Sequence, residues 1–141
     1  LLVKKQDANK FNTIADTKGA QIGAQQTTTQ ESIAKEQTKA TVVSEGLVTS
    51  LTTELLNGKL DGVVVENEIA DNYLKNYPDK YAVAKVNLTT PKSQRYINVA
   101  ARKGDKKLMK KVNKVITKLQ KNGDMDKLLQ KSQDLQSKYG K

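Results

Sequence analysis

Segments typical of strands and of helices alternate between residues 21 and 86 of this 141-residue chain. Short β-branched or apolar runs predict strands at 21–25, 41–43, 63–65 and 82–86. Periodic apolar residues predict helices at 28–39, 47–57 and 66–76. Strands that alternate with helices build parallel sheets whose two faces are covered by the helices. The predicted fold class is therefore α/β, with a parallel-rich open sheet flanked by helices.

The C-terminal part of the chain departs from this alternation. Residues 95–102 carry Tyr96, Ile97 and Val99 and predict another strand. Asp105 is suited to cap a helix whose apolar stripe includes Leu108, Val112, Val115, Ile116 and Leu119. Asn122-Gly123 stops that helix, and a second helix with Met125, Leu128, Leu129 and Leu135 begins at Asp124. We therefore expect two successive C-terminal helices with no strand between them.

Composition excludes several classes of function. The chain has no cysteine and no histidine, so disulfides, thiolate catalysis and ordinary zinc sites are ruled out, and we expect neither metal nor cofactor. The net charge of +10 comes almost entirely from lysine, because Arg95 and Arg102 are the only arginines. Aromatic residues make up 4% of the chain. Nucleic-acid readers use arginine forks and stacking aromatics, so we expect a solvated lysine surface and no nucleic-acid partner.

The first candidate site lies where the strand at 21–25 passes into a helix. Thr28 and Glu31 form a T-x-x-E capping box, in which each side chain is expected to bond the other residue's amide. The amides of Thr29 and Gln30 then remain free at the positive end of the helix, and the Thr27 and Thr29 hydroxyls add donors. A carboxylate or phosphate fits such a site. The alternative is an ordinary capped helix whose free amides bind water.

The second candidate site is Glu66, which follows the valine strand directly. Its carboxylate is expected at the rim of the sheet, where it can receive an ammonium group. The alternative is a surface glutamate in the first turn of a helix, where negative charge is favoured. Together the two sites match the two charges of an α-amino acid. Asp61, Glu66 and Glu68 are close in sequence, but no histidine, cysteine or activated serine accompanies them, so we expect no enzyme.

Three stretches together resemble a known family. They are GAQIGAQQTTTQESIAKE, LLNGKLDGVVVENEIADNYL and RYINVAARKGDKKLMKKVNKVITKLQKNGDMDKLLQK. Their order and spacing are similar to the second lobe of the amino-acid-binding proteins of ABC importers, family 3 of the solute-binding proteins with the type 2 periplasmic-binding-protein fold. The resemblance implies a fragment with a first hinge strand (1–5), ligand-binding lobe two (6–96), a second hinge strand (97–103) and C-terminal helices (104–141) that dock on an absent lobe one.

The resemblance also implies roles for individual residues. Thr29 falls where a backbone amide meets the ligand carboxylate, with Thr28 beside it, and Glu66 falls where an acidic residue pairs with the α-ammonium. Gln25 falls at a position that often faces the ligand side chain. The family usually has glycine where Thr27 stands, and often aspartate at the position of Glu66.

The resulting functional expectation is the substrate-binding component of an ABC transporter, which binds an amino acid between two lobes and delivers it to a membrane permease. Its expected place is outside the cytoplasm, as a periplasmic protein or a cell-surface lipoprotein, with membrane contact only through a lipid anchor or the permease. The alternatives are an enzyme or sensor domain on the same fold, or a lysine-rich polyanion binder. Without lobe one, the apolar stripes of the C-terminal helices predict self-association as a dimer.

Overall fold

The computed structural model describes residues 1–92 and 95–139, which form two compact units, Leu1–Tyr96 and Ile97–Lys141. The first unit contains β1 (Leu2–Lys4), β2 (Gln21–Gln25), α1 (Thr29–Gln37), β3 (Thr41–Glu45), α2 (Val48–Leu56), β4 (Gly62–Val64), α3 (Asn67–Asn76) and β5 (Tyr81–Val83). Two 3-10 turns, η1 (Lys5–Asp7) and η2 (Ile14–Thr17), lie between β1 and β2. The predicted alternation of strands and helices is confirmed.

The strands form one five-stranded sheet in the order β3-β2-β4-β1-β5. Strand β2 pairs in parallel with both β3 and β4, and Gly23 lies opposite Val43 on one side and Val63 on the other. Strand β1 is antiparallel to β4 and to β5, so β5 runs in the same direction as β2, β3 and β4. The parallel-rich open sheet predicted from the sequence is confirmed, with β1 as its one reversed strand.

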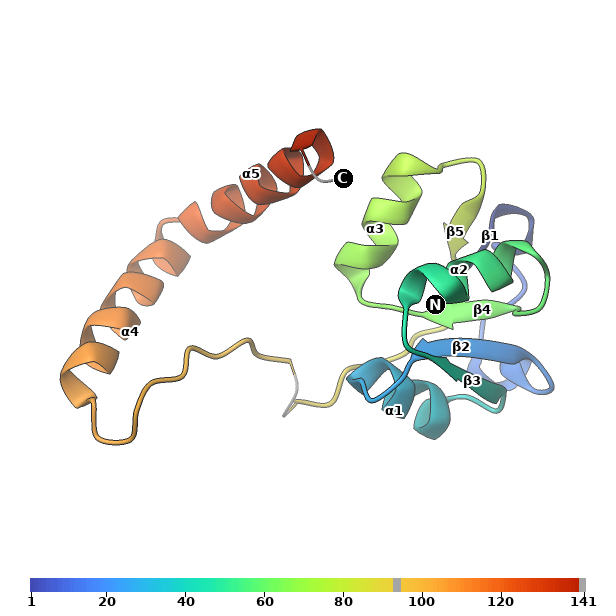
Figure 1. The fold of residues 1–141 in the computed structure, drawn as a ribbon, viewed down its shortest axis with the longest axis horizontal. Coiled ribbons are helices and arrows are strands. Elements are labelled where there is room, and N and C mark those ends of the chain that lie inside the picture. Colours follow the sequence, from blue (N-terminus) through green and yellow to red (C-terminus); the bar gives the residue numbers. More distant parts are fainter. Residues whose placement is uncertain (93–94, 140–141) are drawn as a thin grey trace. The chain divides into compact units, whose positions relative to one another are not determined.

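Successive residues of a strand point to opposite faces of the sheet, and here both faces carry apolar side chains. Helices therefore cover both faces. Figure 1 shows α1 and α2 on opposite sides of the sheet. The core on the α1 side contains Val3, Ile22, Ala24, Ile33, Ala34, Val64 and Ala82. The core on the α2 and α3 side contains Leu2, Leu51, Leu55, Val63, Ala70 and Tyr81. This two-sided packing fixes the strand ends where α1 and α3 begin.

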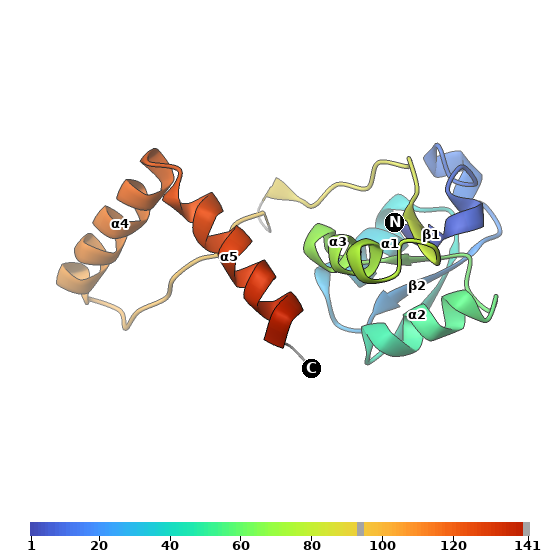
Figure 2. The same cartoon turned by 90° about the horizontal axis from the view of Figure 1, so that it is seen from above.

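The second unit contains α4 (Lys106–Lys121) and α5 (Asp124–Tyr139), as the two apolar stripes predict. The Asp105 carboxylate caps α4 by accepting a hydrogen bond from the Leu108 amide at 3.2 Å. The chain turns at Gly123, whose φ of 68° suits glycine, and the two helices form a V in Figure 2. No residue of α4 is buried. In the described part of the chain, no helix combines the length and the apolar character needed to cross a bilayer.

The strand predicted at 95–102 is wrong. Residues 97–101 form no strand and pair with none of the strands that the structure describes. Ile97 and Val99 are exposed there. A β-branched run becomes a strand only when it pairs with a neighbouring strand, and no described strand pairs with this run. A hinge role for 97–103 remains a prediction, as do the bounds of lobe two (6–96) and of the C-terminal helices (104–141). Residues 93–94 of the first and 140–141 of the second lie outside the described residues.

Candidate functional site

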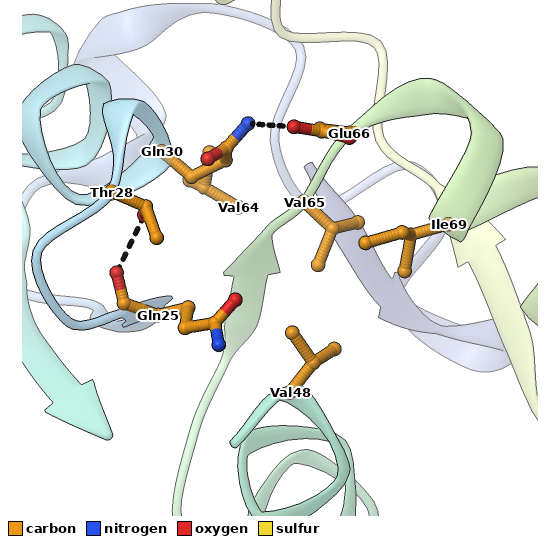
Figure 3. A pocket seen from close by; sticks show the side chains of 8 residues that line it. All are labelled: Gln25, Thr28, Gln30, Val48, Val64, Val65, Glu66 and Ile69. Carbon is orange, nitrogen blue, oxygen red and sulfur yellow. Dashed lines mark hydrogen bonds between the residues drawn. The ribbon is translucent and has the colours of Figure 1, made fainter. Parts of the chain in front are cut away.

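A cavity of about 220 Å³ lies at the carboxyl ends of β2 and β4, in the first unit. Figure 3 shows the side chains that line it, which are Gln25, Thr28, Gln30, Val48, Val64, Val65, Glu66 and Ile69. They come from the β2–α1 turn, the start of α2, the end of β4 and the start of α3. Ligands of open α/β sheets bind beyond the carboxyl ends of the strands. The cavity therefore lies where the sheet topology predicts a site.

The β2–α1 turn is held by Thr28, which caps α1. Its Oγ1 accepts a hydrogen bond from the Glu31 amide at 3.3 Å, as the capping box predicts, and donates one to the Gln25 carbonyl at 2.6 Å. The Thr28 hydroxyl proton is therefore already committed to the turn. Thr27 adopts a left-handed φ of 61°, a conformation that glycine accepts and β-branched residues rarely do. Thr27 thus adopts the backbone conformation that glycine would adopt at this position of the turn.

The Glu31 carboxylate does not close the predicted reciprocal box on Thr28. It accepts from the Thr27 amide at 2.7 Å instead, one residue earlier. Its other oxygen is held at 2.7 Å from Lys35 Nζ and accepts from Ser44 Oγ at 2.6 Å, which draws the carboxylate away from Thr28. The hydrogen bond from Lys35, with those from Ser44 and the Thr27 amide, lowers the pKa of Glu31 to about 2. Glu31 therefore stays ionised and fixes the turn.

The start of α1 offers unused donors. The amides of Thr29 and Gln30 donate no hydrogen bond to any residue of the described ranges, as the capping pattern predicts. Unpaired amides at a helix start carry the positive end of the helix dipole and favour an anion. The Thr27 hydroxyl, expected to add a donor, instead bonds the Gln26 carbonyl at 2.6 Å. The hydroxyls of Thr27 and Thr28 are thus both used within the turn, whereas the amides of Thr29 and Gln30 are not.

Glu66 occupies the N-cap position of α3, directly beyond β4, and its side chain is exposed. Its Oε1 accepts a hydrogen bond from Gln30 Nε2 at 3.1 Å, across the cavity rim in Figure 3. The fold thus brings together two residues that are 36 positions apart. Glu66 is the one titratable side chain among the residues that line the cavity. The cavity is therefore lined both by the Glu66 carboxylate and by Gln30, one of the two residues with an unused amide at the start of α1.

Four of the six predicted site residues line the cavity, namely Gln25, Thr28, Gln30 and Glu66, whereas the side chains of Thr27 and Thr29 do not. Gln25 donates from Nε2 to the Gly46 carbonyl at 2.9 Å, which fixes its orientation. Sequence reasoning missed the apolar lining, which is Val48, Val64, Val65 and Ile69. Val48 follows β3, so the same rule of strand carboxyl ends that indicated Gln25 and Glu66 could have found it.

The two other carboxylates that are close to Glu66 in sequence take no part in the cavity. Asp61 accepts from Lys10 Nζ at 2.7 Å and from the Gln21 amide at 2.8 Å, at the opposite ends of β2 and β4. Burial opposes the charge of Asp61, but the bonds from Lys10 and Gln21 outweigh it and lower its pKa. Glu68 is exposed and does not line the cavity. These residues do not assemble into an acid–base pair with Glu66.

The sequence of the chain matches a known protein family. Residues 3–133 match the model of the bacterial extracellular solute-binding proteins, family 3. The chain is 28% identical over 130 residues to the ABC transporter arginine-binding protein 1 of Escherichia coli (strain K12), which covers 91% of this chain and 52% of that protein. It is also 37% identical over 78 residues to a probable histidine-binding protein of Neisseria gonorrhoeae, covering 55% and 28%.

The fold agrees with solved structures of such proteins. An amino acid ABC transporter substrate-binding protein from Streptococcus pneumoniae, bound to L-arginine, superposes with a TM-score of 0.79 at 34% identity over 94% of this chain and 55% of that one. The chain spans about half the length, or less, of the curated relatives it matches. Because the family model covers nearly all of the sequence and the fold agrees, this chain belongs to the family 3 bacterial extracellular solute-binding proteins.

Proposed function

We propose that the cavity binds the α-carboxylate and α-ammonium of an amino acid, and that this chain is the second lobe of an ABC-transporter substrate-binding protein. The observation that carries the proposal is the pairing of opposite charges at one rim. Free amides of Thr29 and Gln30 begin α1, and the Glu66 carboxylate lies beside Gln30. An α-amino acid carries both complementary charges, on two groups that are bonded to the same carbon. The dipole of α3 favours a negative charge at Glu66 but does not require that this charge lie beside the start of α1.

In this proposal the ligand carboxylate takes the amides of Thr29 and Gln30, where the helix dipole favours it. The ammonium group binds the Glu66 carboxylate and displaces the Gln30 side-chain amide, whose Nε2 lies 3.1 Å from Glu66 Oε1 in the structure. A charged partner makes a stronger hydrogen bond to a carboxylate than a neutral amide does. The ligand side chain lies along Gln25, Val48 and Ile69. A second lobe then closes over the ligand, and exclusion of water strengthens these interactions.

The proposed role is delivery of the bound amino acid to a membrane permease, outside the cytoplasm, by a periplasmic or lipid-anchored protein. Arginine is the first ligand to test, because one relative is named an arginine-binding protein and the structure of another is bound to L-arginine. The role is binding rather than catalysis, since Glu66 has no second proton-transfer group among the lining residues. The residues 97–103 act as the second hinge in this proposal, and residues 1–5 as the first.

The test is a titration of the isotopically labelled chain with L-arginine, followed by NMR. We expect saturable shifts of the Thr29 and Gln30 amide resonances. Agmatine, which lacks the carboxylate, should leave these two amides unmoved, and N-acetylarginine, which lacks the ammonium charge, should bind several-fold more weakly. A panel of the other amino acids under the same conditions defines the preference. Absence of amide shifts with every amino acid at millimolar concentration would overturn the proposal.

Two matched variants separate the ligand role of Glu66 from general charge. Glu66→Gln removes the proposed ammonium partner and should weaken arginine binding about tenfold or more, as loss of a charge-assisted hydrogen bond does. Glu68→Gln removes the same charge from an exposed position two residues later, in the first turn of α3. It should leave binding unchanged. Equal effects of both substitutions would show that Glu66 acts only through net charge.

We also propose that the chain on its own self-associates as a dimer through α4 and α5. Leu108, Val115, Leu128 and Leu129 are each close to half exposed in these helices. Apolar side chains grouped in this way mark a surface that packs against a partner. A second lobe would be that partner in a two-lobed protein, and a second copy serves in its absence.

A further inference from the structure

Helix α4 carries its charge on one side only. Successive residues of an α-helix advance by about 100° around its axis, which places all seven lysines within an arc of about 140°. They are Lys106, Lys107, Lys110, Lys111, Lys114, Lys118 and Lys121, and we call this surface the lysine face. Six apolar residues, Leu108, Met109, Val112, Val115, Ile116 and Leu119, occupy the opposite arc of about 120°. Charge and apolar surface are thus fully separated around this helix.

The lysine face accounts for most of the chain's excess charge. Seven of its 25 basic residues lie in α4, which has no acidic residue, whereas the other 18 face 15 acidic ones. All seven are exposed, and none forms an ion pair with a carboxylate of the described residues. In the first unit, by contrast, Lys10 and Lys35 each lie 2.7 Å from a carboxylate oxygen. The lysine face therefore offers its charge to a partner outside the chain.

We propose that the lysine face is an electrostatic docking surface for the anionic headgroups of a phospholipid bilayer. The 16 residues of α4 make a row of ammonium groups about 24 Å long. Clusters of lysine on an amphipathic helix bind anionic lipid surfaces. Nucleic acid fits less well, because α4 contains neither the arginine nor the aromatic residues that read or stack on bases.

The apolar stripe supports a mode of docking in which the lysine face alone meets the headgroups. Val112, Ile116 and Leu119 are partly buried, and α4 contacts α5. Because the apolar stripe of α4 packs against α5, the lysine face on the opposite side of α4 points away from α5. The bilayer is then held by charge and not by insertion, so salt should release the protein. This inference does not depend on amino-acid binding in the cavity.

The experiment is sedimentation of the whole chain with vesicles. We expect binding at low salt to vesicles that mix phosphatidylcholine with phosphatidylglycerol, and none to pure phosphatidylcholine. Lys107, Lys114 and Lys121 lie at the centre of the arc. Each lysine near an anionic surface contributes about fivefold to partitioning, so the triple Gln variant at these positions should bind about a hundredfold more weakly. Circular dichroism of the variant checks that α4 remains helical.

A second triple variant serves as the control, with Gln in place of Lys18, Lys39 and Lys85. These are exposed and lie in the first unit, and their side chains form no hydrogen bond or ion pair with other described residues. The control has the same net charge as the first variant and should bind within about threefold of the unaltered chain. Equal losses in both variants, binding that survives high salt, or preference for a DNA oligonucleotide over the mixed vesicles would each overturn the proposal.

Discussion

Thr27 holds a left-handed backbone at φ 61° in the turn that leads to the candidate site. A β-branched side chain in this region costs about 1–3 kcal/mol, and the cost is borne because the Thr27 amide bonds Glu31 at 2.7 Å. We predict that Thr27→Gly stabilises the chain by about 1 kcal/mol, after the greater unfolded-state entropy of glycine is subtracted. Urea denaturation monitored by circular dichroism measures the change.

Thr29→Gly is the matched control for that substitution. Thr29 begins α1 and has an ordinary negative φ, since Thr27 is the one non-glycine residue with positive φ in the described chain. Glycine there relieves no strain and should destabilise by about 0.5–1 kcal/mol. Loss of stability in both variants would show that the Thr27 backbone is not strained.

Glu31 gives the turn a dependence on pH. Its pKa of about 2 lies below the ordinary value of 4.5, because Lys35, Ser44 and the Thr27 amide favour the charged form. Ionised Glu31 therefore makes its full contribution to the free energy of unfolding above pH 4.5. This contribution is lost as the pH falls toward 2, where Glu31 of the folded state also takes up a proton. We predict that Glu31→Gln lowers stability at neutral pH and flattens the decline between these values. Denaturation at a series of pH values measures both effects.

Glu36→Gln provides the comparison, because Glu36 is exposed on the same helix and its side chain forms no hydrogen bond or ion pair with described residues. It should leave the pH profile unchanged. Some decline must remain in the Glu31 variant, since backbone amides of Thr13 and Asn12 also lower the pKa of Asp16. A profile for Glu31→Gln identical to that of the unaltered chain would contradict the assigned role.

At the scale of elements, α2 packs on β2 through the absence of a side chain at Gly23. A Cβ placed there would lie 2.7 Å from Leu51 Cδ2 and 2.7 Å from Leu60 Cδ1. Both leucines are buried, so their methyl groups have little room to move. We predict that Gly23→Ala destabilises by about 1–3 kcal/mol, as overpacking does. Gly46→Ala, where no atom lies within 4 Å of the added carbon, should cost nothing, and an equal loss there would refute the packing argument.

Elements whose pattern is local were predictable from the sequence. The strand at 21–25, the cap at Thr28 and the stop at Gly123 follow from residue types within a few positions. The prediction of a strand at 95–102 was wrong because a strand needs a neighbouring strand to pair with, and the residues of the segment itself do not show whether one is present. The positive φ of Thr27 was not predicted for a similar reason, since the Glu31 hydrogen bonds that stabilise the turn include one from Ser44 of β3.

The candidate site shows the same division. Gln25 and Glu66 were predicted because each carries a polar group and lies at or just beyond the carboxyl end of a strand. Val48 and Ile69 line the same cavity but look in sequence like ordinary core residues of a helix. The hydrogen bond between Gln30 and Glu66 depends on the order of β2 and β4 in the sheet. Polar rim residues can thus be found from strand ends, as Val48 could have been, whereas the rest of the apolar wall requires the fold.

At the scale of the whole molecule, the two units differ in how they are stabilised. The first unit has cores on both faces of its sheet, with Phe11, Leu51 and Leu55 almost fully buried. The second unit has no buried residue among those described in α4 and α5. Helices gain most of their stability from packing an apolar face, so α4 and α5 should open more readily than the sheet.

This difference allows a test of the proposed dimer that leaves the fold of the first unit intact. We predict that the molar mass of the chain in light scattering rises toward that of a dimer with concentration. Val115→Ser with Leu128→Ser should keep the chain monomeric, because both side chains are at least half exposed on the apolar stripes. Leu47→Ser, at an exposed leucine of the first unit, should leave the dimer unchanged. An unaltered chain that stays monomeric at every concentration would show that α4 and α5 tolerate an uncovered apolar face.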